Sequence, residues 1–174
     1  MKWNILALYI LIFGFAVVGA IILTQQKRTA YVVTTDVYDK FQMSKELNEK
    51  IKKLEDTRKN ILDSLVFKLK MKQQSIENSK GKDVQMINEF EGMKQEYFMK
   101  QKQFEEDNAK IKDQYFDQIW TQLNQYVQEF GKKNSYVYIL GATGQGTLMY
   151  ADETINVTND LVEYVNQRYN DTAK

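Results

Sequence analysis

The amino-acid sequence predicts an α+β protein that is mostly α, in which a small β body carries a long antiparallel helical hairpin and follows an N-terminal apolar helix. Three observations support this prediction. Apolar residues recur at three-four spacing through residues 39–131, which is the period of a coiled-coil helix. Segments rich in β-branched and aromatic residues flank this repeat on both sides. The chain contains no proline, a residue that costs ~3 kcal/mol inside a helix.

Residues 1–27 are predicted to form a signal or anchor helix. Residues 5–23 carry no charged side chain, and a helix of that length spans roughly 28 Å, close to the ~30 Å hydrocarbon core of a bilayer. The small residues of Val18–Ala20 could form a signal-cleavage site. The apolar run continues past them to Leu23, however, which favours an uncleaved anchor. Two outcomes therefore remain open, a protein anchored to a membrane by residues 5–23 and a soluble one cleaved near Ala20.

Residues 28–38 are predicted to hold the first strand of the body, because the stretch from Ala30 to Val37 is rich in valine, threonine and tyrosine. From about Asp39 the pattern becomes helical. Arg58 interrupts the apolar stripe of this first helix at a place where another apolar residue would be expected. The stripe consists of Leu47, Ile51, Leu54, Ile61 and Leu65.

A polar stretch at residues 78–82 divides the helical region in two, and Gly81 within it is a natural helix breaker. Apolar residues then resume, at first with a spacing of seven. This second stripe consists of Phe90, Tyr97, Phe104, Ile111, Tyr115, Ile119, Leu123, Tyr126 and Phe130. The simplest arrangement of residues 39–131 folds the second helix back antiparallel on the first, with the tip of the hairpin near residues 78–82.

Apolar side chains in the distal half of the hairpin exceed the needs of a two-helix seam. Phe98 and Met99 lie outside the narrow stripe, so part of this apolar surface should face solvent. Methionine is flexible and polarizable, and together with phenylalanine it suits a surface that accepts many partners. We expect the binding surface to consist of Phe67, Met71, Met86, Phe90, Met93, Phe98, Met99 and Phe104.

Lysines are concentrated at the predicted tip, where Glu77 is the single acidic residue between residues 68 and 82. A basic surface of this kind would attract acidic polypeptides or anionic lipid head groups. The expected basic tip consists of Lys68, Lys70, Lys72, Lys80 and Lys82.

Residues 132–174 are predicted to complete the body with a β-hairpin and a C-terminal helix. Gly131 is expected to cap the preceding helix. Residues 136–140 and 147–151 have the composition of strands, and the glycine-rich turn between them lacks the spacing of a phosphate-binding loop. Thr158 is expected to cap the last helix. The apolar face of that helix consists of Leu161, Val162, Val165 and Tyr169.

The composition excludes most enzymatic and metal chemistry. The chain has no cysteine and no histidine, which removes disulfides, thiol nucleophiles, the commonest general base and the commonest metal ligand. Asp152 and Glu153 form an acidic pair, but adjacent side chains in a turn usually point apart. A net charge of +1 argues against a nucleic-acid partner. We therefore expect no enzymatic activity, no cofactor and no metal site.

Two segments of the chain resemble the Skp/OmpH family. The segment from Leu148 to Thr158, with its Tyr-Ala-Asp tripeptide and Val-Thr pair, is similar to the closing strand of that family and the entry to its final helix. The segment from Tyr31 to Val37 resembles the family's first strand, which feeds directly into a long helix. The resemblance covers about residues 30–169 and includes the order of the elements.

The resemblance implies an ATP-independent holdase chaperone in the periplasm of a Gram-negative bacterium. In that family three subunits share strands in a small β-barrel body, and their helical arms enclose unfolded outer-membrane proteins. The implied partners are therefore unfolded outer-membrane clients, further copies of the chain in a homotrimer and, through the apolar run, the inner membrane. That run departs from the family, whose known members are soluble after their signals are cleaved.

The residues favour an oligomer independently of this resemblance. The predicted strands of one chain are too few for a closed sheet, and pooling strands between subunits would remove the exposed edges. Nothing in the sequence sets the number of subunits. The alternative function is a membrane-anchored coiled-coil stalk or adaptor subunit of an envelope complex, which a client-binding assay would distinguish from a chaperone.

Overall fold

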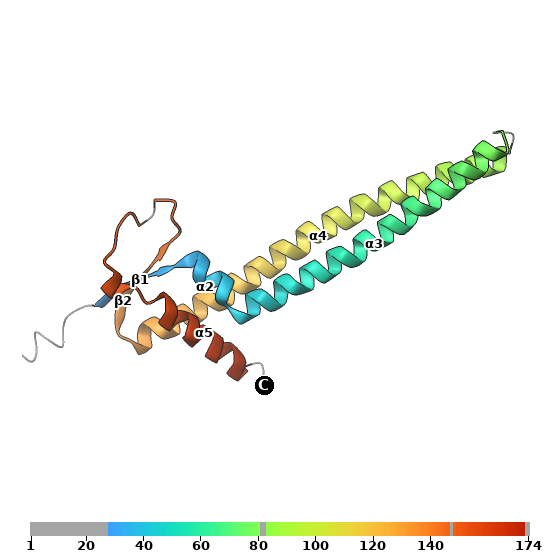
Figure 1. Cartoon of the computed structure of the whole chain (residues 1–174). Coiled ribbons are helices and arrows are strands. Elements are labelled where there is room, and N and C mark those ends of the chain that lie inside the picture. Colours follow the sequence, from blue (N-terminus) through green and yellow to red (C-terminus); the bar gives the residue numbers. More distant parts are fainter. Residues whose placement is uncertain (1–27, 81–82, 147, 173–174) are drawn as a thin grey trace, which may run out of the picture. The chain divides into compact units, whose positions relative to one another are not determined.

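The computed structural model describes residues 28–80, 83–146 and 148–172. The elements follow one another as β1 (Arg28–Val33), α2 (Thr34–Lys40), α3 (Gln42–Asn78), α4 (Val84–Lys133), β2 (Tyr136–Ala142), the 3-10 turn η1 (Glu153–Ile155) and α5 (Thr158–Thr172) (Figure 1). The predicted fold class, mostly helical with a small sheet, is confirmed. The predicted anchor at residues 5–23 and the cleavage site at Ala20 lie outside the described residues. Within the described part of the chain, no helix combines the length and the apolar character needed to cross a membrane.

The chain divides into two compact units. The first, which we call the β unit, contains described residues from 28–37 and 127–164. The second, which we call the hairpin unit, contains described residues from 38–126 and 165–172.

The β unit is built on two parallel strands. β1 pairs with β2 from Arg28 opposite Tyr136 to Val33 opposite Ala142. Parallel strands cannot be joined by a tight turn, and here the connecting chain consists of helices. η1 follows β2, and Tyr31 forms a single bridge to Asn156 just after it. The buried side chains of this unit are Ala30, Tyr31, Val32, Val37, Phe130, Val157, Thr158 and Leu161.

The first strand is shorter than predicted. A strand was expected within residues 28–38, but β1 ends at Val33 and the following residues form α2. The backbone N–H of Val33 donates to the side-chain hydroxyl of Thr158 at 2.9 Å. A side chain, and not the backbone of a neighbouring strand, therefore accepts the N–H of the last residue of β1. A Cβ on Gly141 would lie only 2.8 Å from the hydroxyl of Thr34. β2 therefore passes directly against the start of α2.

The predicted β-hairpin is wrong. Among the described residues, β2 pairs with β1 alone, and residues 148–151 form no strand. Gly144 and Gly146 do adopt positive φ values of 73° and 94°, as a turn there requires. The described segment after the turn forms no strand and pairs with none. Met149 and Tyr150 in this segment are 87% and 82% exposed.

Neither predicted cap is correct. α4 continues past Gly131 to Lys133 and ends where Ser135 takes a φ of 58°. A Cβ on Gly131 would lie 3.4 Å from Cδ1 of Ile139, so this glycine allows β2 to pack closely on α4. Thr158 is the first residue of α5, and the side chain of Asn156 accepts its backbone N–H at 3.0 Å.

The hairpin unit contains two long helices that run antiparallel, as predicted (Figure 1). Their register follows from three ion pairs across the helices. These pairs join Glu55 to Lys112 at 2.6 Å, Arg58 to Asp107 at 3.6 Å, and Lys72 to Glu89.

The seam between α3 and α4 differs from the prediction at one position. Ile61 was expected in the apolar stripe, but it is exposed and Leu62 is half-buried instead. Arg58 occupies a seam position, and the next residue on the same face, four positions on, is Leu62. Every predicted stripe residue of α4 from Phe90 to Phe130 is half-buried or buried, as expected.

The core of the hairpin unit gathers at the end opposite the tip. There, the side-chain amide of Asn166 on α5 makes two hydrogen bonds to the junction of α2 and α3. It accepts from the backbone N–H of Gln42 at 2.6 Å and donates to the carbonyl of Lys40 at 3.0 Å. Further out, α3 and α4 pack on no other described element, so their seam stays half-buried. The buried apolar residues of this unit are Phe41, Met43, Leu47, Ile119, Leu123, Tyr126 and Val165.

Candidate functional site

The eight apolar residues predicted as a binding surface separate into two groups. Four of them are half-buried in the seam of the hairpin unit. The ring of Phe104 lies under the guanidinium of Arg58 at 5.3 Å, and the ring of Phe90 lies 5.6 Å from the ammonium of Lys94. This group therefore stabilises the hairpin and offers little free surface. It consists of Met86, Phe90, Met93 and Phe104.

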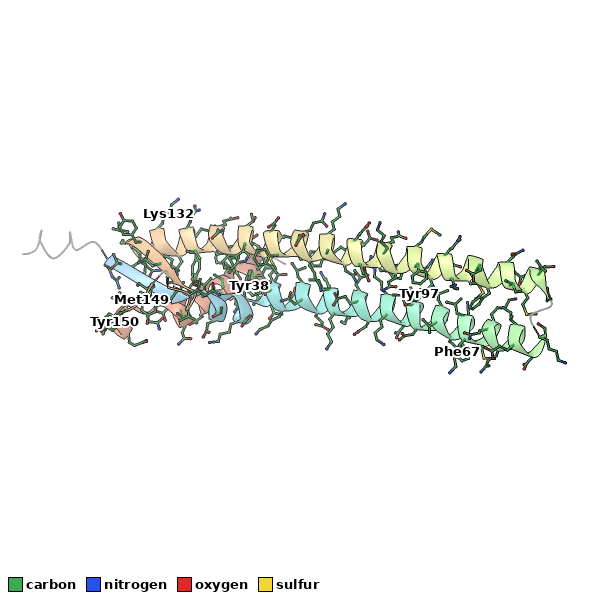
Figure 2. The ribbon with its side chains drawn as sticks, turned by 90° about the horizontal axis from the view of Figure 1, so that it is seen from above. Tyr38, Phe67, Tyr97, Lys132, Met149 and Tyr150 are labelled. Carbon is green, nitrogen blue, oxygen red and sulfur yellow. The ribbon has the colours of Figure 1, made fainter. Side chains whose placement is uncertain are left out.

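The other four residues are exposed. Phe67 and Met71 are one helical turn apart on α3, and Phe98 and Met99 are consecutive on α4. Phe67 and Met99 expose 64% and 67% of their surface. In Figure 2, Phe67 lies on the side of α3 that faces away from α4, whereas Tyr97 lies between the helices. We call this group, Phe67, Met71, Phe98 and Met99, the distal apolar surface.

Several exposed apolar residues of the same helices were missed. Val66 and Val84 are exposed although neither was assigned to the surface, and Ile61 was assigned to the seam. Counting four residues on from Arg58 would have placed Leu62 in the seam and left Ile61 and Val66 outside it. These residues extend the apolar area that α3 and α4 present to solvent.

The basic tip carries less free charge than the sequence suggests. Lys68, Lys70 and Lys80 are exposed, and Lys82 lies outside the described residues. Lys72, however, forms an ion pair with Glu89 from α4. The hydrogen bond from Lys72 lowers the pKa of Glu89, and a second bond from Gln85 adds to this effect.

The β unit presents its own exposed apolar surface. On β2, Val137, Tyr138 and Leu140 are exposed, so side chains on both faces of the strand reach solvent. Met149 and Tyr150 follow in the segment after the turn (Figure 2). A two-stranded sheet leaves strand edges unpaired and is marginal in isolation. We call Val137, Tyr138, Leu140, Met149 and Tyr150 the β-unit surface.

The acidic pair Asp152 and Glu153 serves the local structure. The carboxylate of Asp152 accepts hydrogen bonds from the hydroxyl and the backbone N–H of Thr154, at 2.7 and 2.9 Å, and these bonds lower its pKa. Glu153 accepts from the hydroxyl of Tyr31 at 3.1 Å. The two side chains thus point to different partners. Within the described ranges, no group of three acidic residues is placed to hold a metal ion.

Comparison with known proteins places the chain in a family. The family model of the outer membrane protein (OmpH-like) matches residues 28–165. A similar solved structure is that of a putative outer membrane chaperone (OmpH-like) from Caulobacter crescentus CB15, with a TM-score of 0.67 and 13% sequence identity. The match covers 82% of this chain and 85% of that chain, and at this identity the likeness is one of fold. No curated protein matches the sequence. Because the family model spans most of the chain, the protein belongs to the outer membrane protein (OmpH-like) family.

Proposed function

We propose that this protein is an ATP-independent holdase chaperone that binds unfolded outer-membrane proteins. The observation that carries the proposal is the distal apolar surface, in which Phe67, Met71, Phe98 and Met99 stand exposed on a pair of long helices. A patch of exposed apolar side chains, unlike a single exposed one, marks an interaction site, and methionine adapts to many partners. The description of the Caulobacter crescentus relative as an outer membrane chaperone agrees with this assignment.

The binding mechanism needs no catalytic residue, cofactor or nucleotide. Each exposed phenylalanine or methionine offers a weak apolar contact to an unfolded chain. Several such contacts on one hairpin, and several hairpins in one assembly, add up through effective concentration. The exposed lysines Lys68, Lys70 and Lys80 would speed the encounter with acidic clients, an effect that salt weakens.

Oligomerisation is the second part of the proposal. The β-unit surface is a group of exposed apolar residues on β2 and in the segment after it, and among the described residues β2 pairs with no strand other than β1. Further copies of the chain would cover these residues and extend the sheet across subunits, which removes the edges. We propose a homotrimer, in which each subunit contributes one helical hairpin.

The proposed location is the periplasm of a Gram-negative bacterium, where outer-membrane clients pass in an unfolded state. Residues 5–23 would anchor the protein in the inner membrane and keep it near the point where clients emerge. The alternative, release after cleavage near Ala20, would leave the binding mechanism unchanged. Membrane fractionation of cells that express the full chain separates the two.

The test is an aggregation assay in which a urea-unfolded porin is diluted into buffer with the full-length protein in mild detergent. The parent should keep the porin soluble. A variant with serine at Phe67, Met71, Phe98 and Met99 should lose most of this protection while its circular dichroism is unchanged, because these side chains are exposed. The control variant carries serine at the exposed residues Gln74, Gln95 and Gln103. Equal protection by both variants would rule out the distal apolar surface as the client site.

Light scattering separates the chaperone from the alternative, an anchored coiled-coil stalk or adaptor. A chaperone should show the mass of a trimer and should take up the unfolded porin as a soluble complex. A stalk or adaptor should keep its own mass unchanged when the porin is added.

A further inference from the structure

A pocket in the hairpin unit stands apart from the distal apolar surface. Its volume is about 290 Å³, at the small end of the range for ligand sites and sufficient for a single side chain. α2, α3 and α4 each contribute residues to it. The lining consists of Tyr38, Asn48, Ile51, Lys112, Asp113 and Phe116.

Aromatic rings form one wall of the pocket. The rings of Tyr38 and Phe116 lie 6.3 Å apart at an angle of 43°. Both rings also contact Trp120, which stacks on Tyr38 at 5.9 Å and meets Phe116 edge-on at 6.0 Å. Phe116 is nevertheless 53% exposed. Its neighbours fix the position of the Phe116 ring, and its exposed face is available to a cation, which the electrons of an aromatic ring attract.

The charges around the pocket also favour a cation. Lys112 donates to Glu55 across the helix pair at 2.6 Å, so its charge is compensated within the protein. Asp113 forms no hydrogen bond or ion pair with any residue that the structure describes. The pocket therefore offers one free carboxylate beside two aromatic rings, while an anionic ligand would be repelled by Asp113.

Trp120 packs behind the pocket and is the one member of the cluster outside the pocket lining. Its indole Nε1 is buried and has no hydrogen-bond partner among the described residues. Leaving a buried donor unpaired carries a free-energy penalty, and native proteins rarely accept one.

We propose that this pocket binds a single arginine side chain of an unfolded polypeptide, an inference that rests on the proposed holdase function. The guanidinium is planar and weakly hydrated, so it can stack on the exposed ring of Phe116 while it hydrogen-bonds to Asp113. A compact, strongly hydrated ammonium fits this combination less well. The pocket thus gives the chaperone a preference for basic positions in its clients, in addition to the apolar preference of the distal apolar surface.

The test uses the full-length protein in mild detergent and two fluorescent unstructured peptides that differ at one residue. One peptide carries arginine and the other citrulline, which has the same shape without the charge. We expect the arginine peptide to bind about tenfold more tightly by fluorescence anisotropy. The sequence contains two tryptophans, so Trp3→Phe leaves Trp120 as the sole tryptophan, and its emission, measured with unlabelled peptides, should change only with the arginine peptide.

Two pocket variants and a matched control make the test specific. Asp113→Asn and Phe116→Leu should each remove most of the preference for arginine over citrulline. Asp117→Asn changes an exposed charge on the next helical turn, outside the pocket lining, and should leave the preference intact. Equal binding of the two peptides by the parent protein overturns the proposal. A changed oligomeric mass for Phe116→Leu overturns it as well, because the pocket would then be covered by a second copy of the chain.

The aggregation assay separates this inference from the proposed function. Full protection of the porin combined with equal binding of both peptides would remove the arginine pocket and leave the holdase function standing. A clear arginine preference in a protein that fails to protect the porin would support the pocket and remove the holdase function.

Discussion

Arg58 on α3 lies 3.6 Å from the carboxylate of Asp107 on α4. The same guanidinium donates a hydrogen bond to Asn108 and sits over the ring of Phe104 at 5.3 Å. The Arg58 side chain is only 15% exposed, so a charged residue fills a position that the helical period would assign to an apolar one. A slip of either helix would leave this arginine without its partners. The pairing therefore opposes alternative registers of the hairpin.

Replacing Arg58 should distinguish this role from simple packing. Arg58→Ala should lower the free energy of unfolding by about 1–3 kcal/mol, because Asn108 and Asp107 lose a half-buried partner. Arg58→Leu restores the apolar seam and should stay closer to the parent, because the side chain of Asp107 is 45% exposed and can be hydrated. Urea unfolding followed by circular dichroism provides the comparison. Equal destabilisation by both variants would mean that restoring apolar volume does not help, and that the lost polar contacts of the guanidinium account for the whole effect.

Glu46 should make the stability of the hairpin unit depend on acid pH. The amide of Gln42 and the hydroxyl of Tyr169 both donate to its carboxylate, at 2.9 and 2.8 Å, and they lower its pKa, the bond from Gln42 having the larger effect. The folded state thus favours the ionised form. The stabilisation is complete above the pKa of the unfolded chain, about 4.3, and disappears as the pH falls through the lower pKa of the folded state.

Thermal unfolding measured from about pH 7 down to about pH 3 tests this dependence, since it brackets the titration of a carboxyl group. Glu46→Gln should flatten the decline on the acid side, and Tyr169→Phe should reduce it because one of the two donors is lost. Burial and the bond to Glu46 raise the pKa of Tyr169, so the tyrosine itself should not titrate in this range. An acid limb that is unchanged in Glu46→Gln would assign the dependence to other carboxyl groups.

Local periodicity predicted the helical part of this fold well. Apolar spacing located the two long helices and the tip between them, because a seam of two helices needs an apolar residue on nearly every turn. Composition also located the strand at residues 136–140 and the last helix. The strand predicted within residues 28–38 was too long. The β-branched residues of this stretch suit a strand by composition. The strand nevertheless ends at Val33, where the chain meets Thr158 and Gly141, residues that lie more than a hundred positions further along the sequence.

The candidate site was predicted less completely, for a related reason. The sequence shows which residues are apolar or basic, but pairing across the hairpin decides which of them are free. Glu89 lies 17 residues from Lys72 and neutralises it, which no count of nearby acidic residues could show. The pocket beside Phe116 draws on three helices, so its residues are scattered from Tyr38 onward and carry no motif.

Two glycines should respond in opposite ways to the same substitution. Gly92 lies inside α4, and the position that a Cβ would take there has no other atom within 4 Å. Gly92→Ala should therefore stabilise the protein by up to about 1 kcal/mol through helix propensity alone. Gly141→Ala would bring its Cβ to 2.8 Å from the hydroxyl of Thr34 and should destabilise the protein. Melting temperatures of both variants give the comparison. A stabilising Gly141→Ala would show that the start of α2 can move away from β2 at little cost.

The exposed lysines of the tip and the ion pair between Lys72 and Glu89 should contribute unequally to client capture. Lys68→Gln, Lys70→Gln and Lys80→Gln together remove charge that faces solvent, so at low salt they should slow association with an acidic unfolded client several-fold and weaken the dependence on salt. Replacing both Lys72 and Glu89 with glutamine removes an ion pair whose charges already compensate each other, so the net charge and the long-range field around the tip should change little. Stopped-flow association at two salt concentrations separates the two variants. If the loss of the Lys72–Glu89 pair slows capture as much as the loss of the three exposed lysines, the association rate does not follow the charge of the tip.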